Sequence, residues 1–138
     1  NPAIIAALET RPDAIVICPS NPFVSIDPIL NLPNMRKRLR TTKSMIVAVS
    51  PIVAGKSLKG PTGKMMKELS IPATAIQIGH HYEKLIDGFV LDSLDAADEQ
   101  VLKNFGLETV ATQTVMVTLE DRVALARAVL EFIRQARN

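Results

Sequence analysis

Two apolar stretches and the polar loops that follow them decide the fold of this chain. The first is Ala14-Ile15-Val16-Ile17-Cys18-Pro19-Ser20-Asn21-Pro22, and the second is Met45-Ile46-Val47-Ala48-Val49-Ser50-Pro51-Ile52-Val53-Ala54-Gly55-Lys56. Continuous apolar runs rich in β-branched residues are typical of strands that are buried on both faces of a parallel sheet. Ligands of open α/β sheets bind beyond the carboxyl ends of such strands, where these two loops lie. Because the loops are rich in hydroxyl, amide, glycine and lysine groups, we expect a ligand that carries phosphate.

The rest of the chain alternates between helix-like and strand-like segments. The sequence predicts further strands over 88–92 and 109–111, and helices over 2–8, 25–30, 34–40, 62–69, 95–105 and 120–134. Residues 72–82 fit either a strand or a helix, and we favour the helix. The alternation predicts one α/β unit over residues 1–138, a Rossmann-like layered sheet that is mostly parallel and has helices on both faces.

The last predicted helix carries an apolar stripe at helical spacing. We expect its buried residues to be Val123, Ala126, Leu130 and Ile133.

Composition excludes several classes of function. Only 4% of the residues are aromatic, none is Trp and the net charge is +2. This composition argues against nucleic-acid binding. The basic residues of 36–40 and Lys43 are typical of a solvated helix face, with a polyanion patch as the alternative. No apolar run approaches the ~20 residues of a membrane span. The single cysteine, Cys18, is expected to be buried in its strand, and we expect a reducing, cytoplasmic setting.

The first loop offers donors on a stiff backbone. Pro19 and Pro22 restrict the chain on either side of Ser20 and Asn21, whose side chains can donate hydrogen bonds to phosphate oxygens. Ser, Asn and Pro are also common turn residues, so an ordinary strand-to-helix turn is the alternative.

The second loop resembles a P-loop only superficially. The first glycine of a P-loop would stand five residues before Gly55, and Ser50 occupies that position. The segment from Gly60 to Lys64 opens a helix, where backbone amides favour an anion, and an ordinary helix start with a surface lysine is the alternative.

Other polar residues give weaker signals. His80 and His81 are adjacent, so they point in different directions and do not form a metal pair by spacing. Asp92 ends the strand at 88–92, where magnesium or ribose contacts are common, although a capping role is more typical. No Ser/His/Asp triad or zinc cluster is visible in the sequence.

Several separate blocks of the chain, in their order and spacing, resemble the 2-phospho-L-lactate transferases. The blocks are Pro19-Ser20-Asn21-Pro22 with Ser25-Ile26 and Pro28-Ile29, Val47 to Val53, Lys59-Gly60-Pro61 with Lys64-Met65-Met66, His81-Tyr82, Phe89 to Asp92 with Asp95, and Thr114 with Met116. The resemblance covers nearly the whole chain. It implies transfer of a phospholactyl or phosphoenolpyruvyl group from a guanosine diphosphate conjugate to a deazaflavin alcohol in coenzyme F-420 biosynthesis, with release of GMP and a requirement for magnesium.

The loops and the resemblance together predict the site. Nucleotide and phosphate binding is expected at Ser20, Asn21, Pro22, Ser25, Ser50, Pro51, Gly55, Lys59 and Gly60. No catalytic residue or metal ligand is assigned within the chain. Proteins of that family are longer, and the acidic residues and Gly-Gly-Thr-Gly segment of their N-terminal half are absent here. The chain is therefore expected to be a C-terminal part that lacks the deazaflavin site and is inactive alone, and a homodimer is the assembly to test.

A second class of function shares this fold. Sugar-nucleotide-binding regulators are related but are not transferases, and they carry a different first loop and a Thr-Gln-Pro-Gly type of second loop. A fragment that binds nothing is a third reading. For a part of a larger sheet, we expect exposed Ile, Val or Leu side chains on one side.

Overall fold

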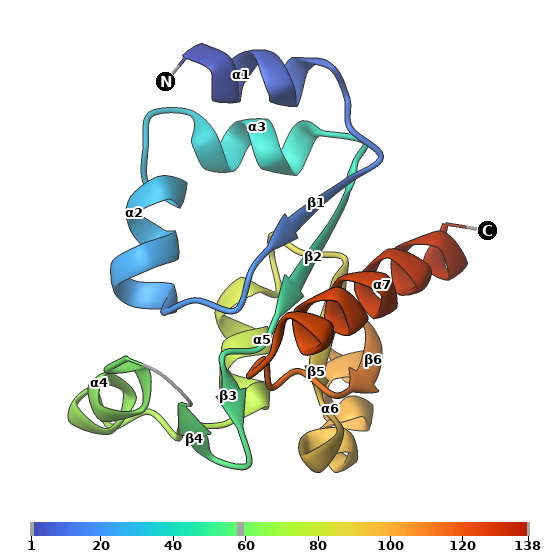
Figure 1. Ribbon diagram of the computed structural model, residues 1–138. Coiled ribbons are helices and arrows are strands. Elements are labelled where there is room, and N and C mark those ends of the chain that lie inside the picture. The colour runs from blue at the N-terminus through green and yellow to red at the C-terminus, as the bar shows by residue number, and fades with distance from the viewer. Residues whose placement is uncertain (1, 58–59, 138) are drawn as a thin grey trace.

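The central element is a four-stranded parallel sheet (Figure 1). The computed structural model describes residues 2–57 and 60–137. The strands are β1 (Ala14–Ile17), β2 (Met45–Val49), β5 (Gly88–Asp92) and β6 (Glu108–Thr112), in the order β1-β2-β5-β6. Each neighbouring pair is parallel, and the register aligns Val47 of β2 with Val16 and Gly88. The Rossmann-like α/β sheet predicted from the sequence is confirmed.

Most helices cover one face of this sheet. Phe89 and Leu91 of β5 are fully buried there against Ile78 and Leu102. The helices with side chains in this core are α1 (Pro2–Glu9), α2 (Asp27–Leu30), α3 (Met35–Thr41), α4 (Thr62–Glu68), α5 (Ala75–Tyr82) and α6 (Glu99–Asn104). The π-helix η1 (Pro22–Ile26) precedes α2, and the 3₁₀-helix η2 (Ser93–Asp98) precedes α6. The segment with ambiguous pattern, 72–82, contains α5, which begins where the Thr74 hydroxyl accepts a hydrogen bond from the Gln77 N–H.

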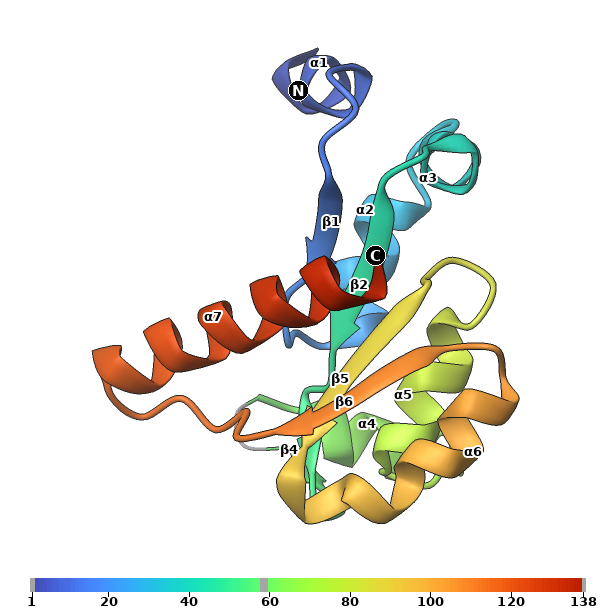
Figure 2. The ribbon, with the colours of Figure 1, turned by 90° about the vertical axis from the view of Figure 1, so that its right-hand side faces the viewer.

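The opposite face of the sheet is covered by α7 (Leu119–Ala136). Val47, Val49 and Val90 of the strands pack there against Leu125 and Val129 of the helix. The helix begins with a capping box in which the Thr118 and Asp121 side chains each bond the other's backbone. Figure 2 shows that the amino-terminal end of α7 projects away from the sheet, whereas its carboxyl-terminal end lies across it.

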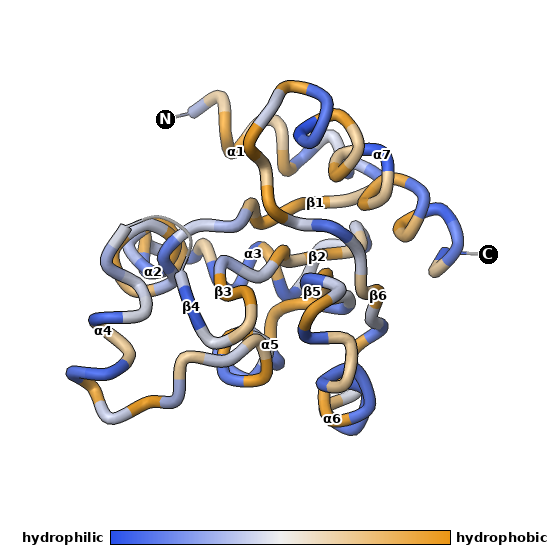
Figure 3. Tube along the Cα trace, turned by 60° about the horizontal axis from the view of Figure 1, so that its bottom comes forward, coloured by the Kyte–Doolittle hydropathy of each residue, from blue (hydrophilic) through white to orange (hydrophobic). Residues whose placement is uncertain are grey.

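The predicted buried stripe of α7 is wrong at three of its four positions. Val123, Ala126 and Leu130 are exposed, and only Ile133 is buried. The face against the sheet is formed by Leu125, Val129, Phe132 and Ile133 instead. Figure 3 shows hydrophobic and hydrophilic positions alternating along α7. Since the helix has two apolar stripes, periodicity alone could not say which one packs against the sheet.

The prediction that β1 is buried on both faces is also wrong. β1 pairs only with β2 and lies at the edge of the sheet, so Val16 is 40% exposed. Cys18, which follows this strand, is exposed rather than buried. Exposed apolar side chains were expected on one side of the sheet, but they occur on both sides. Val16, Val123 and Leu130 are exposed on the α7 side, and Ile4 of α1 and Val101 of α6 are exposed on the opposite side.

The segment after β2 forms a hairpin, which the sequence did not predict. It consists of β3 (Ile52–Val53) and β4 (Lys56–Ser57), which pair antiparallel. Its two-residue turn has positive φ at both Ala54 (47°) and Gly55 (76°), the geometry of a type I′ turn. The hairpin is followed by the short helix α4 (Thr62–Glu68).

Candidate functional site

A cavity of about 530 Å³ lies beyond the carboxyl ends of the strands. Four segments form it: the loop after β1, the loop after β2, the start of α4, and the stretch between β6 and α7. Its described lining residues are Pro19, Ser20, Asn21, Val24, Ser25, Ser50, Pro51, Val53, Gly60, Pro61, Thr62, Thr114, Val115, Met116 and Val117. The sheet thus brings together six of the nine predicted site residues: Ser20, Asn21, Ser25, Ser50, Pro51 and Gly60.

Asn21 shapes the first loop through its side chain. The Asn21 Oδ1 accepts hydrogen bonds from the N–H groups of Phe23 (2.9 Å) and Val24 (3.2 Å), which caps η1. Its Nδ2 lies 3.4 Å from the Met65 sulfur of α4. The amide is therefore engaged by the fold, and it places the neighbouring Ser20 and Ser25 at the cavity wall. Ser25 is exposed and Ser20 is half-buried.

Ser50 plays a similar part in the second loop. This residue is buried, and its hydroxyl donates to the Ile52 carbonyl (2.9 Å) and accepts from the Ile52 N–H (3.1 Å). The Ser50 N–H donates to the Val90 carbonyl at 2.8 Å, which ties the loop to β5. Ser50 and Pro51 thus form a rigid wall of the cavity.

Two predicted site residues are absent from the described wall of the cavity. Pro22 is buried as the first residue of η1, and Gly55 occupies the turn of the β3–β4 hairpin. Lys59 lies outside the described residues. The neighbouring Gly60 does line the cavity, with a φ of 71° that favours glycine, and its carbonyl accepts from the Ser57 hydroxyl at 3.3 Å.

Sequence reasoning missed the wall formed by residues 114–117. The Asp92 carboxylate holds this wall in place, because it accepts from the Thr114 N–H (2.8 Å) and hydroxyl (2.9 Å) and from the Leu94 N–H (3.0 Å). Burial alone would raise the pKa of Asp92, but these hydrogen bonds outweigh it and hold the pKa below its ordinary value. Asp92 is therefore a cap, as its position predicted. Thr114 and Met116 belong to one of the segments that resemble the 2-phospho-L-lactate transferases, and that resemblance could have indicated that this wall is part of the site.

The described part of the cavity wall carries no ionisable side chain. The nearby Asp95 accepts from the Ala54 N–H at 3.0 and 3.1 Å, and Asp92 is fully engaged. Within the described residues no group of three or more His, Cys, Asp or Glu side chains could hold a metal ion. The carboxylates beside this cavity therefore do not fit a magnesium site, and we assign no magnesium ligand among the described residues.

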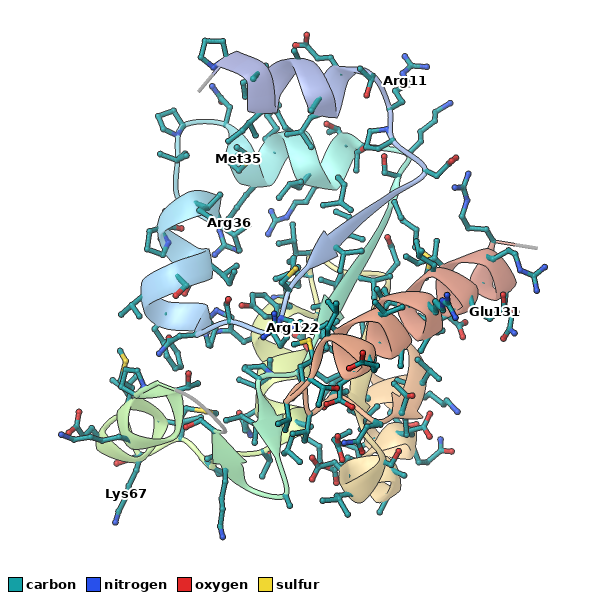
Figure 4. The ribbon with its side chains drawn as sticks, viewed as in Figure 1. Arg11, Met35, Arg36, Lys67, Arg122 and Glu131 are labelled. Carbon is teal, nitrogen blue, oxygen red and sulfur yellow. The ribbon has the colours of Figure 1, made fainter. Side chains whose placement is uncertain are left out.

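The two histidines lie away from the cavity wall. His81 Nε2 is 3.0 Å from the Asp27 carboxylate, and the His81 ring packs edge-on against Phe23 of η1. Arg36 of α3 points toward α2 (Figure 4), where it is 3.3 Å from Asp27. The hydroxyl of the adjacent Tyr82 has no partner among the described residues, and burial raises its pKa. This group joins α2, α3 and α5.

The described residues contain no helix with the length and apolar character needed to cross a bilayer.

Comparisons with known proteins agree with the geometry. The family model described as 2-phospho-L-lactate transferase CofD matches residues 1–135. The 2-phospho-L-lactate transferase of Methanosarcina barkeri is 36% identical over 130 residues, which are 94% of this chain and 41% of that protein. The enzyme of the same name from Methanocaldococcus jannaschii is 38% identical over 120 residues, 87% of this chain and 37% of that protein.

A third protein of that name, from Methanococcus maripaludis, is 34% identical over 131 residues, 95% of this chain and 40% of that protein. The chain thus spans about two fifths of the length of the curated relatives it matches. The match extends through the β1 loop, the hairpin and the wall at 114–117, all of which lie within residues 1–135. This chain belongs to the 2-phospho-L-lactate transferase family.

Proposed function

We propose that the full-length protein transfers a phospholactyl or phosphoenolpyruvyl group from a guanosine diphosphate conjugate to a deazaflavin alcohol and releases GMP. The present chain supplies part of the site for the donor. The observation that carries this proposal is the cavity at the carboxyl ends of the strands, in a chain of the 2-phospho-L-lactate transferase family. We further propose that the protein acts in the cytoplasm, with a homodimer as the assembly to test.

The cavity offers two kinds of contact to a substrate. The hydroxyls of Ser20 and Ser25 can donate to oxygen atoms of the donor, and the apolar wall of Val53, Val115 and Met116 keeps water away from it. Phosphoryl transfer depends chiefly on the positioning of the reacting groups and on neutralisation of their charge. In this proposal the cavity positions the donor.

Charge neutralisation must then come from groups outside the described part of the cavity wall. The described wall has no cationic side chain, and the carboxylates beside it are engaged by backbone and hydroxyl groups. Bound magnesium would supply positive charge to the phosphate oxygens, and its ligands are proposed to lie outside the described residues. The deazaflavin acceptor is likewise proposed to bind mainly to the part of the family's chain that is absent here.

Thermal unfolding of the full-length protein tests the donor site. GDP should raise the unfolding temperature, because a ligand that binds only the folded state stabilises it. The same concentration of a uridine diphosphate sugar should raise it less. The double variant Ser20→Ala, Ser25→Ala should lose most of the GDP effect, whereas the control Ser93→Ala, which removes an exposed hydroxyl outside the cavity, should keep it.

Two outcomes would overturn the proposal. A larger stabilisation by the uridine diphosphate sugar would favour a sugar-nucleotide-binding regulator with the same fold. An unchanged GDP effect in the double serine variant would show that the cavity is not where the nucleotide binds.

A further inference from the structure

The edge strand β1 and the helix α7 leave apolar surface uncovered on the same side of the sheet. We define the β1–α7 face by Val16 of β1 and by Leu119, Val123, Ala126 and Leu130 of α7. The large side chains on it are 40% (Val16), 66% (Leu119), 42% (Val123) and 65% (Leu130) exposed. An apolar surface that combines a strand edge with a helix face is typical of an interaction site.

The free edge of β1 carries no charged residue, proline or bulge within the strand. Proteins usually guard such an edge with charged residues, proline or a bulge, because its unpaired backbone groups can pair with another strand. Ala14–Ile17 contains only apolar residues and pairs with β2 in regular register. Side chains alternate along a strand, so Val16 lies on the face that carries Ala14 and, across the ladder, Val47, which belongs to the core under α7.

The exposed residues of α7 form a second stripe, separate from the one that packs on the sheet. Leu119, Val123, Ala126 and Leu130 follow one another at intervals of four, three and four, so they share one side of the helix. At 3.6 residues per turn, the centre of this stripe is turned by about 110° from the buried stripe of Leu125, Val129, Phe132 and Ile133.

The handedness of the fold directs this second stripe toward β1. The connections from β1 to β2 to β5 to β6 are parallel crossovers, which are right-handed and carry their helices on the face opposite to α7. α7 returns antiparallel to the strands, since Arg137 near its end contacts Asp13 at the start of β1 (2.8 Å). In a right-handed helix that runs antiparallel to the strands, a rotation of about 110° from the buried stripe to the second stripe directs the second stripe toward the β1 side of the sheet.

We propose that a strand and a helix from the part of the full-length protein outside this chain cover the β1–α7 face. The strand pairs with the free edge of β1, and the helix packs against Val16 and the second stripe of α7. The relatives supply enough chain for this, because the match covers only 41% of the Methanosarcina barkeri protein.

Two arginines beside the second stripe of α7 indicate which charges the covering helix should carry. Arg122 and Arg127 flank the second stripe on its two sides, and neither has an ion-pair partner among the residues that the structure describes. Figure 4 shows Arg122 near the amino-terminal end of α7. The helix that covers the stripe is therefore expected to carry carboxylates at its margins.

The added strand would also complete the substrate cavity. An added strand that runs parallel to β1 would have its carboxyl end beside the loop that follows β1. Ligands of open α/β sheets bind beyond the carboxyl ends of the strands. The loop with Ser20 follows β1, so the loop after the added strand would border the cavity opposite residues 114–117.

Cysteine labelling of the full-length protein tests this cover. The variant Val123→Cys places a thiol on the second stripe, and its matched control is Val101→Cys on α6, at the other face of the sheet. The two valines have almost equal exposure here, 42% and 39%. With maleimide labelling read peptide by peptide, Val123→Cys should react on the order of a hundredfold more slowly than Val101→Cys, because labelling requires local opening of the cover. Equal unfolding temperatures of the variants show that both are folded.

Two results would overturn the proposal. Equal labelling rates would show that the second stripe stays exposed in the full-length protein. Protection of Val123→Cys that disappears when the protein is diluted to monomers would identify a second copy as the occupant. The labelling is measured without substrate, so its result does not depend on the proposed transferase activity.

Discussion

At the scale of single residues, the polar groups around the cavity divide into two sets. Asn21, Ser50 and Asp92 use their side chains to hold the loops in place. The side chains of Ser20 and Ser25 line the cavity, and their hydroxyls bond to no other described residue. Sequence alone named four of these five as site residues, but it could not separate the two sets, because a side chain that caps a turn and one that binds phosphate are chemically alike.

Asp92 should stabilise the folded state in a pH-dependent way. Its folded pKa is below the ordinary 3.8, so its contribution is full above that value and is lost as the pH falls through the folded pKa. Asp92→Asn should lower the free energy of unfolding at neutral pH by about 1.5–3 kcal/mol, because charged hydrogen bonds are lost. Urea unfolding of both proteins between pH 7 and pH 3 measures this. An equal difference at every pH would exclude the ionised carboxylate as its source.

Loss of the Asn21 side chain should lower folding stability, whereas loss of the Ser20 hydroxyl should weaken GDP binding. Asn21→Ala removes the cap of η1 and should cost about 1 kcal/mol of folding free energy. Ser20→Ala should leave stability unchanged and weaken GDP binding about tenfold, since one hydrogen bond to a charged group is lost. Calorimetric titration of GDP and urea unfolding separate the two effects. If Ser20→Ala unfolded as readily as Asn21→Ala, the division into scaffold and site would be wrong.

At the scale of elements, the sequence predicted the four strands of the sheet and most helices, because each has a clear apolar pattern and is bounded by residues typical of loops. It failed where the pattern does not contain the answer. The apolar sequence Ala14–Ile17 of β1 is compatible with a strand at the edge of a sheet and with one in its centre. The helix α7 has two apolar stripes, and only one of them packs on the sheet. The β3–β4 hairpin was missed because its turn uses Ala54, a residue that rarely adopts positive φ.

Gly88 should be required for the packing of α7 on the sheet. A Cβ at this position of β5 would lie 2.8 Å from Cε1 of Phe132 and 3.0 Å from the Met45 methyl group. Gly88→Ala should therefore destabilise the protein by about 1–3 kcal/mol through overpacking. The smaller side chain of Phe132→Leu should recover part of that loss in the double variant. Additive costs in this cycle, measured by urea unfolding, would show that Gly88 and Phe132 do not compete for space.

At the scale of the whole molecule, the cavity joins segments that are far apart in the sequence. The parallel order of the strands brings the loops after β1 and β2 to one end, as the rule for open α/β sheets predicts. Residues 114–117 reach the same place through Asp92, a contact across 22 positions that no local pattern shows. The free edge of β1 and the second stripe of α7 mark the side on which we propose that further elements cover this sheet.

The isolated 138-residue chain should associate with itself and lack transfer activity. Its β1–α7 face exposes a strand edge and apolar side chains, which promote association. Light scattering of the purified chain should show species larger than a monomer, and Val123→Glu with Leu130→Glu should reduce them. A monomer that stays dispersed at high concentration would show that this face needs no cover.

The most direct measurement is turnover by the full-length protein. Three proteins are compared: the wild type, the double variant that carries both Ser20→Ala and Ser25→Ala, and the control Ser93→Ala. Each is mixed with guanosine diphosphate-linked phospholactate, the deazaflavin alcohol and magnesium, and the products are quantified by mass spectrometry. We expect GMP and phospholactyl deazaflavin in equal amounts from the wild type and from Ser93→Ala, and a rate at low donor concentration at least about tenfold lower from the double serine variant. Turnover by the double serine variant at the wild-type rate would contradict the assignment of this cavity to the donor, and no turnover by the wild type would contradict the transferase function.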